Sequence, residues 1–269
     1  MPNLVKRFLL PCFMALTMGL SGLAQAGDAL QRIIDFDVLK VGISMTQPPL
    51  NFTSRDGKPM GMDVDMAKAM AAAMKVRLEV VPLPFGDLMT ALEDDKVDMV
   101  ISGMSITPER TEMASFVGPY MMSGKSILTK KDTVATISST EEVNRPTLKL
   151  AALRNSTSAA FIREVAPEAQ LVEVEDYDDG VAMVMNDKAD GMVADMPACA
   201  LAILRYPNAG LTMLSEPLTV EPLGIAVSKD DAQFVNLIEN YLDAYEKLGV
   251  VNKMRKKWLE DKSWVVALP

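Results

Sequence analysis

Short apolar runs that alternate with longer helical patterns constrain the fold of this chain more than any other feature. The runs are rich in valine, isoleucine and leucine, and they predict strands at 38–44, 78–82, 99–102, 148–153, 171–175, 192–194 and 224–227. The clearest helical pattern between them places Met62, Met66 and Met70 on one face, as in an amphipathic helix that packs on a sheet. This alternation predicts parallel strands joined by crossover helices, which are typical of α/β proteins. We therefore expect an α/β fold.

The first residues have the form of a secretory leader. Lys6 and Arg7 precede an apolar stretch over residues 8–23, and Ala24-Gln25-Ala26 provides small residues for cleavage. A permanent membrane anchor is the alternative, but proline and glycine interrupt the stretch, and the surroundings of Cys12 fit lipid attachment poorly. We expect a signal peptide over residues 1–26, cleavage after Ala26 and export of the remaining chain.

Composition excludes several classes of function. Cleavage would remove two basic residues and no acidic one, so the net charge would fall from −9 to −11, and such a chain repels nucleic acid. The chain has no histidine, the commonest general base and metal ligand, so we expect no catalytic triad, no metal site and no cofactor. The mature chain would keep one cysteine, Cys199, which rules out an intramolecular disulfide. Stability must come from the core.

Two segments have the character of crossings between lobes. Residues 122–126 are mostly small and polar and precede a strand expected from Ile127, and residues 216–223 contain the sequence Glu-Pro-Leu twice. Proline disfavours helix in the residue before it, so the second segment should be extended. Two crossings imply that the chain leaves one lobe, builds another and returns. The helical C-terminal stretch over residues 230–260 should then pack on the first lobe.

Arg110 is the first candidate for chemistry, because it lies at an expected helix start after Thr107-Pro108. A cation is mildly unfavourable at a helix N-terminus unless an anion is shared there. Together with the hydroxyls of Ser102 and Ser105, its guanidinium would form a trap for a carboxylate. The alternative is a surface arginine paired with a neighbouring glutamate, and the local sequence is equally compatible with both.

Two further candidates follow expected strands. The turn Asn155-Ser156-Thr157-Ser158 has residues that favour exposed backbone N–H groups, and Asp195 lies at a strand end, where ligands bind in open α/β sheets. Ordinary helix capping is the alternative for both, and for Asp195 the two roles can coexist. Together, Arg110 and the Thr157 turn for a carboxylate and Asp195 for an ammonium group indicate recognition of a zwitterion.

The chain from about Val38 to Trp258 resembles the family 3 solute-binding proteins, the amino-acid receptors of bacterial ABC importers. The most specific blocks are Ser-Ile-Thr-Pro-x-Arg at residues 105–110 and Phe-x-x-Pro-Tyr at residues 116–120. Other matching stretches follow in the expected order at 61–67, 96–104, 188–191 and 224–227.

The resemblance implies a two-lobed type II periplasmic binding protein fold, in which two α/β lobes are joined by a two-strand hinge. Lobe 1 would comprise residues 27–122 and 222–269, lobe 2 residues 127–217, and the hinge crossings residues 123–126 and 218–221. The lobes of such proteins swing together, and ligand contacts on both lobes stabilise the shut form.

The resemblance also implies roles for single residues. Arg110 would hold an α-carboxylate with help from Ser105 and Thr157, and Asp195 would hold the α-ammonium group. Gly103 would offer its backbone carbonyl, and the ring of Phe85 would form a wall of the cleft. The residues expected to bind ligand are Arg110, Asp195, Ser105, Thr157, Ser156, Gly103, Phe85, Gln47 and Ser102.

Two departures from the family pattern limit this reading. Gln47 lies in the turn where relatives often have an aromatic residue, and Asn155 replaces a usual glycine. Both changes affect the pocket beyond the amino-carboxylate head.

The expected function is a periplasmic, monomeric binding protein, not an enzyme, that delivers an amino acid or related carboxylate to an ABC permease in the inner membrane. The alternative is a cyclohexadienyl dehydratase acting on prephenate or arogenate. The resemblance implies that such enzymes carry a carboxylate just beyond the position of Asp195, and residues 196–199 here are Met-Pro-Ala-Cys.

Overall fold

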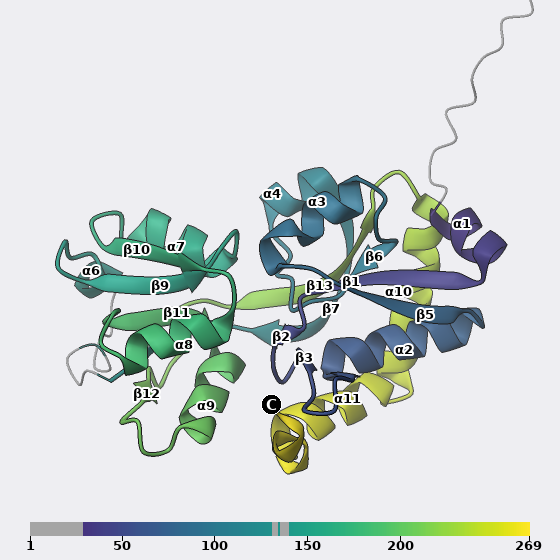
Figure 1. Ribbon diagram of the computed structural model, residues 1–269. Coiled ribbons are helices and arrows are strands. Elements are labelled where there is room, and N and C mark those ends of the chain that lie inside the picture. The colour runs from purple at the N-terminus through teal and green to yellow at the C-terminus, as the bar shows by residue number, and fades with distance from the viewer. Residues whose placement is uncertain (1–28, 131–133, 135–139) are drawn as a thin grey trace, which may run out of the picture.

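A computed structural model describes residues 29–130, 134 and 140–269, and these form two lobes side by side (Figure 1). The predicted leader and Cys12 lie outside the described residues. Each lobe is built on a five-stranded sheet with helices on its faces, and a small three-stranded sheet belongs to the first lobe. The expected α/β class is confirmed.

The first sheet has the order β5-β1-β6-β13-β7. Its parallel part consists of β5 (Arg77–Pro82), β1 (Val38–Ile43) and β6 (Met99–Val100). The expectation of parallel strands is wrong for β13 (Glu221–Ser228), which runs antiparallel to both β6 and β7 (Ala114–Ser123). The reason is the return of the chain from the second lobe, which brings β13 into the sheet from the opposite end.

The second sheet has the order β10-β9-β11-β8-β12. β10 (Gln170–Val174), β9 (Lys149–Leu153) and β11 (Gly191–Asp195) are parallel, whereas β8 (Lys125–Thr129) and β12 (Thr212–Met213) are antiparallel to their neighbours. Its helices are α6 (Thr140–Val143), α7 (Thr157–Val165), α8 (Tyr177–Met185) and α9 (Met196–Arg205).

Helices and a small sheet complete the first lobe. In α2 (Met62–Met74), Met62, Met66 and Met70 are buried on one face, as expected. The expected C-terminal helix is broken at Gly249, whose left-handed conformation separates α10 (Ala232–Lys247) from α11 (Val250–Arg255), and α11 continues directly into the π-helical turn η2 (Lys256–Glu260). The remaining elements are α1 (Ala29–Phe36), β2 (Thr46–Gln47), β3 (Asn51–Thr53), β4 (Pro59–Met60), η1 (Phe85–Asp87), α3 (Leu88–Glu93), α4 (Pro108–Met113) and η3 (Ser263–Ala267).

Two extended segments connect the lobes. β7 ends at Ser123 and β8 begins at Lys125, so only Gly124 separates strands of different sheets. On the return, Leu218 N donates to Lys125 O at 2.8 Å, and Glu221 then opens β13 opposite Ser123. The crossings therefore run beside each other between the lobes (Figure 1). The exact lobe and hinge bounds given above stay predictions.

Each lobe has its own packed interior. Buried residues of β1, α2 and α10 form the first core together with Trp258 and Phe52, whose rings lie 6.0 Å apart at 80°. The second lobe has a core around Ile127, Leu150 and Val193. A further cluster contains residues of both lobes, among them Leu88, Met104 and Leu153, so the two lobes are in contact. Within the described residues, no helix is long and apolar enough to cross a membrane.

Candidate functional site

Arg110 lies at the boundary between the lobes. Thr107 caps α4 as expected, because its Oγ1 accepts from Arg110 N at 3.3 Å. The guanidinium Nη1 donates to Ser105 O at 2.9 Å, and Nη2 donates across the boundary to Asn155 O at 3.3 Å. The guanidinium carbon lies 5.7 Å from the centre of the Phe85 ring. The structure thus brings together Arg110, Ser105 and Phe85 from the expected set.

The alternative reading of Arg110 is wrong. No ion pair joins it to Glu109 or Glu112, although both residues are described. Burial lowers the pKa of the guanidinium, while the nearby carboxylates of Glu221 and Asp195 oppose that shift. An arginine side chain remains charged in a protein, so the cation faces the boundary without a partner carboxylate in hydrogen-bond contact.

The turn before α7 reaches the same place from the second lobe. Asn155 takes a left-handed conformation with φ of 55°, and its side-chain Nδ2 donates to Gly86 O in the first lobe at 3.3 Å. Ser156 Oγ caps α7 by accepting from Ala159 N at 3.1 Å, so ordinary capping is confirmed for Ser156. Thr157 Oγ1 lies 3.4 Å from Ser105 Oγ, so hydroxyls from both lobes meet beside Arg110.

Asp195 ends β11 and is buried. Its Oδ1 accepts from Ser123 Oγ at 3.1 Å and Lys125 Nζ at 3.2 Å, and its Oδ2 accepts from Tyr177 Oη at 3.2 Å. It is the N-cap residue of α9, as the capping alternative expected, but its side chain makes no capping bond. The carboxylate instead faces the hinge, where it neutralises a lysine.

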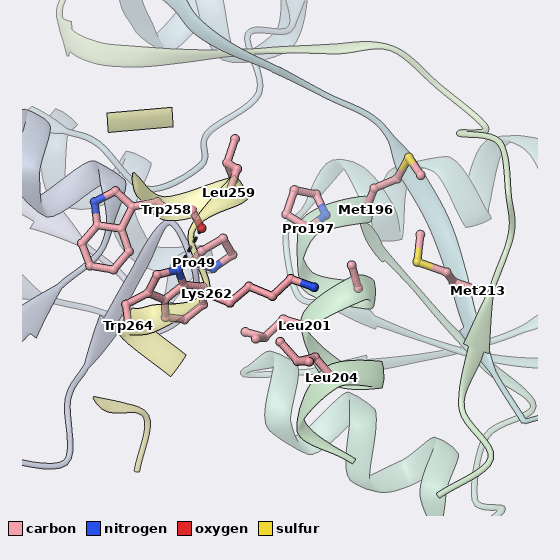
Figure 2. Close-up of a pocket in the computed structure, with 11 residues that line it drawn as sticks. Pro49, Met196, Pro197, Leu201, Leu204, Met213, Trp258, Leu259, Lys262 and Trp264 are labelled. Carbon is pink, nitrogen blue, oxygen red and sulfur yellow. Dashed lines mark hydrogen bonds between the residues drawn. The ribbon is translucent and has the colours of Figure 1, made fainter. Parts of the chain in front are cut away.

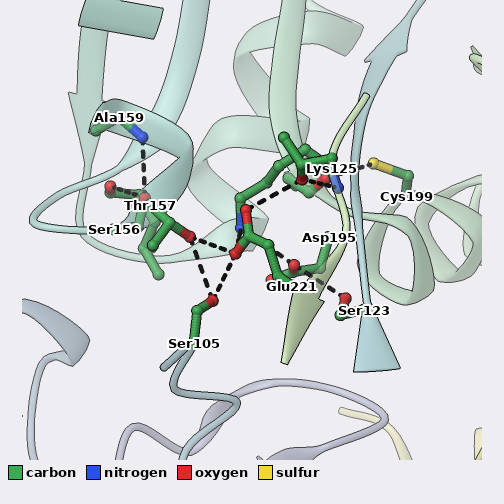
Figure 3. A network of polar contacts seen from close by, with 12 residues as sticks. Ser105, Ser123, Lys125, Ser156, Thr157, Ala159, Asp195, Cys199 and Glu221 are labelled. Atoms are coloured by element: carbon green, nitrogen blue, oxygen red, sulfur yellow. Dashed lines mark hydrogen bonds and ion pairs between the residues drawn. The ribbon is translucent and has the colours of Figure 1, made fainter. Parts of the chain in front are cut away.

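Sequence reasoning missed Lys125 and Glu221, which are central to the network in Figure 3. Lys125 is only 2 % exposed, and its Nζ lies 2.9 Å from Glu221 Oε2. The same Oε2 accepts from Ser105 Oγ at 2.5 Å and Thr157 Oγ1 at 2.8 Å, and Oε1 accepts from Thr219 Oγ1 at 3.1 Å. One carboxylate oxygen therefore collects donors from both lobes and the hinge.

A signal for this pair exists in the sequence. Each expected hinge crossing contains one charged residue, Lys125 in 123–126 and Glu221 in 218–221, and the signs are opposite. Since the two crossings must run beside each other, an ion pair between them could have been predicted.

The charges of the site are balanced. Burial acts to raise the pKa of Glu221, but Lys125 and the hydroxyls of Ser105 and Thr157 outweigh it, so the pKa is lowered and the group is ionised at neutral pH. The site has two cationic side chains, Arg110 and Lys125, and two carboxylates, Asp195 and Glu221. A zwitterion would preserve this neutrality, whereas a ligand with net charge would not.

The remaining expected residues lie in the first lobe. Ser102 is fully buried, and its Oγ accepts from Ser44 N at 3.0 Å, so it faces the lobe interior. Gly103 has φ of +57°, and a Cβ there would lie 2.8 Å from the Leu50 side chain and 3.0 Å from Gln47 Oε1. Gln47 is 4 % exposed, and its Nε2 is the buried side-chain nitrogen that lacks a hydrogen-bond partner among the described residues.

Two hollows share part of their lining, and the smaller of them reaches Gln47. The smaller, of about 10 Å³, is lined by residues that include Gln47, Tyr177 and Asp195. The larger, of about 310 Å³, lies between α9 and the C-terminal segment (Figure 2). Pro49 and Pro197 line both hollows. The larger hollow is mostly apolar, and the residues around it are Pro49, Met196, Pro197, Ala200, Leu201, Leu204, Met213, Trp258, Leu259, Lys262 and Trp264.

Comparison with known proteins gives a consistent result. The chain matches the family described as bacterial extracellular solute-binding proteins, family 3, over residues 39–261. It is 27% identical to a cyclohexadienyl dehydratase of Pseudomonas aeruginosa over 94% of this chain and 95% of that protein. It is 29% identical to ABC transporter arginine-binding protein 1 of Escherichia coli over 82% of this chain and 90% of that protein.

A solved structure extends the comparison to the fold. The crystal structure of the ancestral amino acid-binding protein AncCDT-1, a precursor of cyclohexadienyl dehydratase, has a TM-score of 0.78 and 34% identity, covering 85% of this chain and 98% of that one. The two lobes and this likeness confirm the type II periplasmic binding protein fold.

Proposed function

Because this chain belongs to the bacterial extracellular solute-binding proteins of family 3, we propose that it captures an amino acid between its lobes and delivers it to an ABC importer. The observation that carries the proposal is the position of Arg110 at the lobe boundary, where its guanidinium donates to the backbone carbonyl of Ser105 and the Ser105 hydroxyl lies 3.4 Å from that of Thr157 in the other lobe. A forked guanidinium with two hydroxyl donors matches the geometry of a carboxylate. Arg110 would hold the α-carboxylate.

The rest of the ligand would lie toward Asp195 and Gln47. Asp195 would take the α-ammonium group, which would share its carboxylate with Lys125. The unpartnered Gln47 Nε2 favours a side chain that presents a hydrogen-bond acceptor, since a buried donor without an acceptor is destabilising. The Gly103 carbonyl and the Phe85 ring would complete the walls of the cleft.

Closure of the lobes would provide the mechanism of capture. Contacts across the boundary, such as Asn155 to Gly86 O at 3.3 Å and Arg154 to Asp87 at 3.4 Å, form only when the lobes are together. A ligand that touches both lobes stabilises the closed form by the difference between its affinities for the closed and open forms. The closed form would then dock on the permease.

The cellular setting follows from the leader and the family. We infer that the leader is cleaved after Ala26, that the mature protein is a monomer in the periplasm, and that its partner is an inner-membrane ABC permease. The names of two relatives, ABC transporter arginine-binding protein 1 and ABC transporter glutamine-binding protein GlnH, support the ABC transporter as partner.

A thermal-shift screen tests the proposal. The chain from Gly27 would be unfolded and refolded to remove bound solute, then heated with each of the common amino acids, dicarboxylates and prephenate. A compound at 100 times its Kd stabilises the folded form by about 2.7 kcal/mol. Arg110→Ala should abolish this stabilisation and leave the melting temperature without ligand nearly unchanged. Full ligand stabilisation in Arg110→Ala would contradict the proposal.

A dehydratase is the second candidate, and the Pseudomonas aeruginosa relative favours it. Such an elimination needs an acid that protonates a leaving hydroxyl. Near Asp195, α9 begins with Met196, Pro197 and Ala198, and the lowered pKa of Glu221 makes it a poor proton donor at neutral pH. With purified protein, prephenate and arogenate should therefore be converted no faster than their uncatalysed background rates. Turnover above background would establish the enzyme.

A further inference from the structure

Glu221 occupies the place where the proposed function puts a ligand carboxylate. Its Oε2 accepts from Ser105 at 2.5 Å and Thr157 at 2.8 Å, the two hydroxyls that would assist Arg110. We propose that Glu221 is a built-in carboxylate that bridges the lobes, and that a ligand carboxylate binds by taking these two hydroxyls from it. The inference rests on the proposed function only in its second part, since the bridge itself involves no ligand.

The backbone fixes Glu221 beside the first lobe. Glu221 lies opposite Ser123 in the pairing of β13 with β7, and Ile106 N donates to Pro222 O at 2.8 Å. Ser105 forms an isolated bridge with Leu223. Ser105 and Glu221 therefore belong to one rigid unit, and their contact would persist when the lobes part.

The contact with Thr157 is different, because Thr157 begins α7 in the second lobe. Opening must break the hydrogen bond from Thr157 to Glu221. Lys125 begins β8 directly after the crossing, and its Nζ lies 2.9 Å from Glu221 Oε2, close to the axis about which the lobes would turn. The Thr157 bond is thus the part of the Glu221 network that favours closure.

Exchange of one carboxylate for another leaves no charge unpaired. When a ligand carboxylate takes the hydroxyls of Ser105 and Thr157, Glu221 keeps Lys125 and Thr219 as partners. The two hydroxyls then donate in both states, so in the wild type they contribute little to the difference in free energy between bound and free protein. The two hydroxyls should contribute measurably to ligand affinity only when Glu221 no longer accepts from them.

This reasoning predicts non-additive effects on affinity. In the wild type, Thr157→Val should change the Kd for L-glutamine or L-arginine by less than about threefold. In Glu221→Gln, where the Thr157 hydroxyl donates less strongly to residue 221, the same substitution should raise the Kd about tenfold. The Kd of Glu221→Gln alone combines easier displacement of a neutral side chain with loss of the bridge that favours closure, so the coupling between the two substitutions is the quantity that tests the inference. Titration calorimetry of the refolded chain from Gly27 measures all four variants.

The bridge is tested separately without ligand by small-angle X-ray scattering. Glu221→Gln and Thr157→Val should each increase the radius of gyration of the refolded protein. Glu216→Gln is the matched control, because Glu216 begins the other Glu-Pro-Leu sequence and is exposed, so it should leave the radius unchanged.

The outcomes separate the two proposals. An unchanged radius in both bridge variants, or additive effects of the two substitutions on Kd, would overturn the inference. Failure of every amino acid to bind wild-type protein would count against the proposed function, and the scattering comparison would still decide the bridge.

Discussion

Lys125→Met tests whether one buried cation holds two carboxylates at the hinge. Lys125 is 2 % exposed and contacts Asp195 at 3.2 Å and Glu221 at 2.9 Å. Methionine keeps most of the packing volume and removes the charge. Two carboxylates would then face each other in a space that is largely closed to water.

The magnitude follows from the partners that remain. Removing one member of a buried ion pair destabilises a protein by roughly 3–5 kcal/mol. Asp195 would keep Ser123 and Tyr177, and Glu221 would keep its hydroxyl donors, so we expect a loss near the lower limit, about 3 kcal/mol. For a chain of this size, that loss lowers Tm by about 6–12 °C.

The pH dependence has a definite sign. In the variant, burial still acts to raise the pKa of Glu221, while Lys125, the strongest influence that lowers this pKa, is gone, so the folded variant binds a proton at Glu221 more tightly than the folded wild type does. The deficit relative to wild type should therefore shrink as pH falls from 7 to 5. Calorimetry or urea unfolding at both pH values measures it.

Two controls accompany Lys125→Met. Lys188→Met removes an exposed lysine and should change the free energy of unfolding by less than about 0.5 kcal/mol. Adding Glu221→Gln to Lys125→Met should restore part of the stability, because it removes one of the two uncompensated charges. The reasoning is refuted if Lys125→Met costs no more than Lys188→Met, or if the deficit grows as pH falls.

Three further predictions concern other buried groups. Burial raises the pKa of Asp63 to about 6 despite its bonds to Tyr120 and other donors, so its proton stabilises the fold. As pH rises from 4 to 7, wild type should lose roughly 2 kcal/mol of unfolding free energy relative to Asp63→Asn, measured by urea unfolding. Gly61→Ala should lower the unfolding free energy by roughly 2–4 kcal/mol, because φ is +125° and the new Cβ would lie 2.2 Å from Leu50 O; an unchanged urea midpoint would contradict this. Burial raises the pKa of Cys199 to about 12, so a thiol reagent should react with it only after unfolding.

Much of the fold could be predicted because its signals are local. The apolar runs located β1 and β9 to within a residue at each end, since buried strands need continuous apolar sequence. The direction of β13 could not be read in this way. It depends on where the chain returns from the second lobe, and strand direction leaves no mark on composition.

The same distinction between local and long-range signals applies to the residues of the site. Thr107, Pro108 and Arg110 form a local motif, so the position of Arg110 at the start of α4 was predictable. The contact between Glu221 and Thr157 joins residues 64 positions apart, and no local pattern contains it. Only the pairing of the two crossings, with one charge in each, could have indicated that the hinge contributes to the site.

The central claim is that Arg110 and its neighbours recognise the α-carboxylate of an amino acid. Titration calorimetry with the amino acid that stabilises the protein most, and with the same compound as its primary α-amide, tests it most directly. The account predicts at least about a hundredfold weaker binding of the amide in wild type, because a charge-assisted contact with the guanidinium is lost, and little discrimination in Arg110→Ala. Equal affinity of wild type for acid and amide would contradict the account.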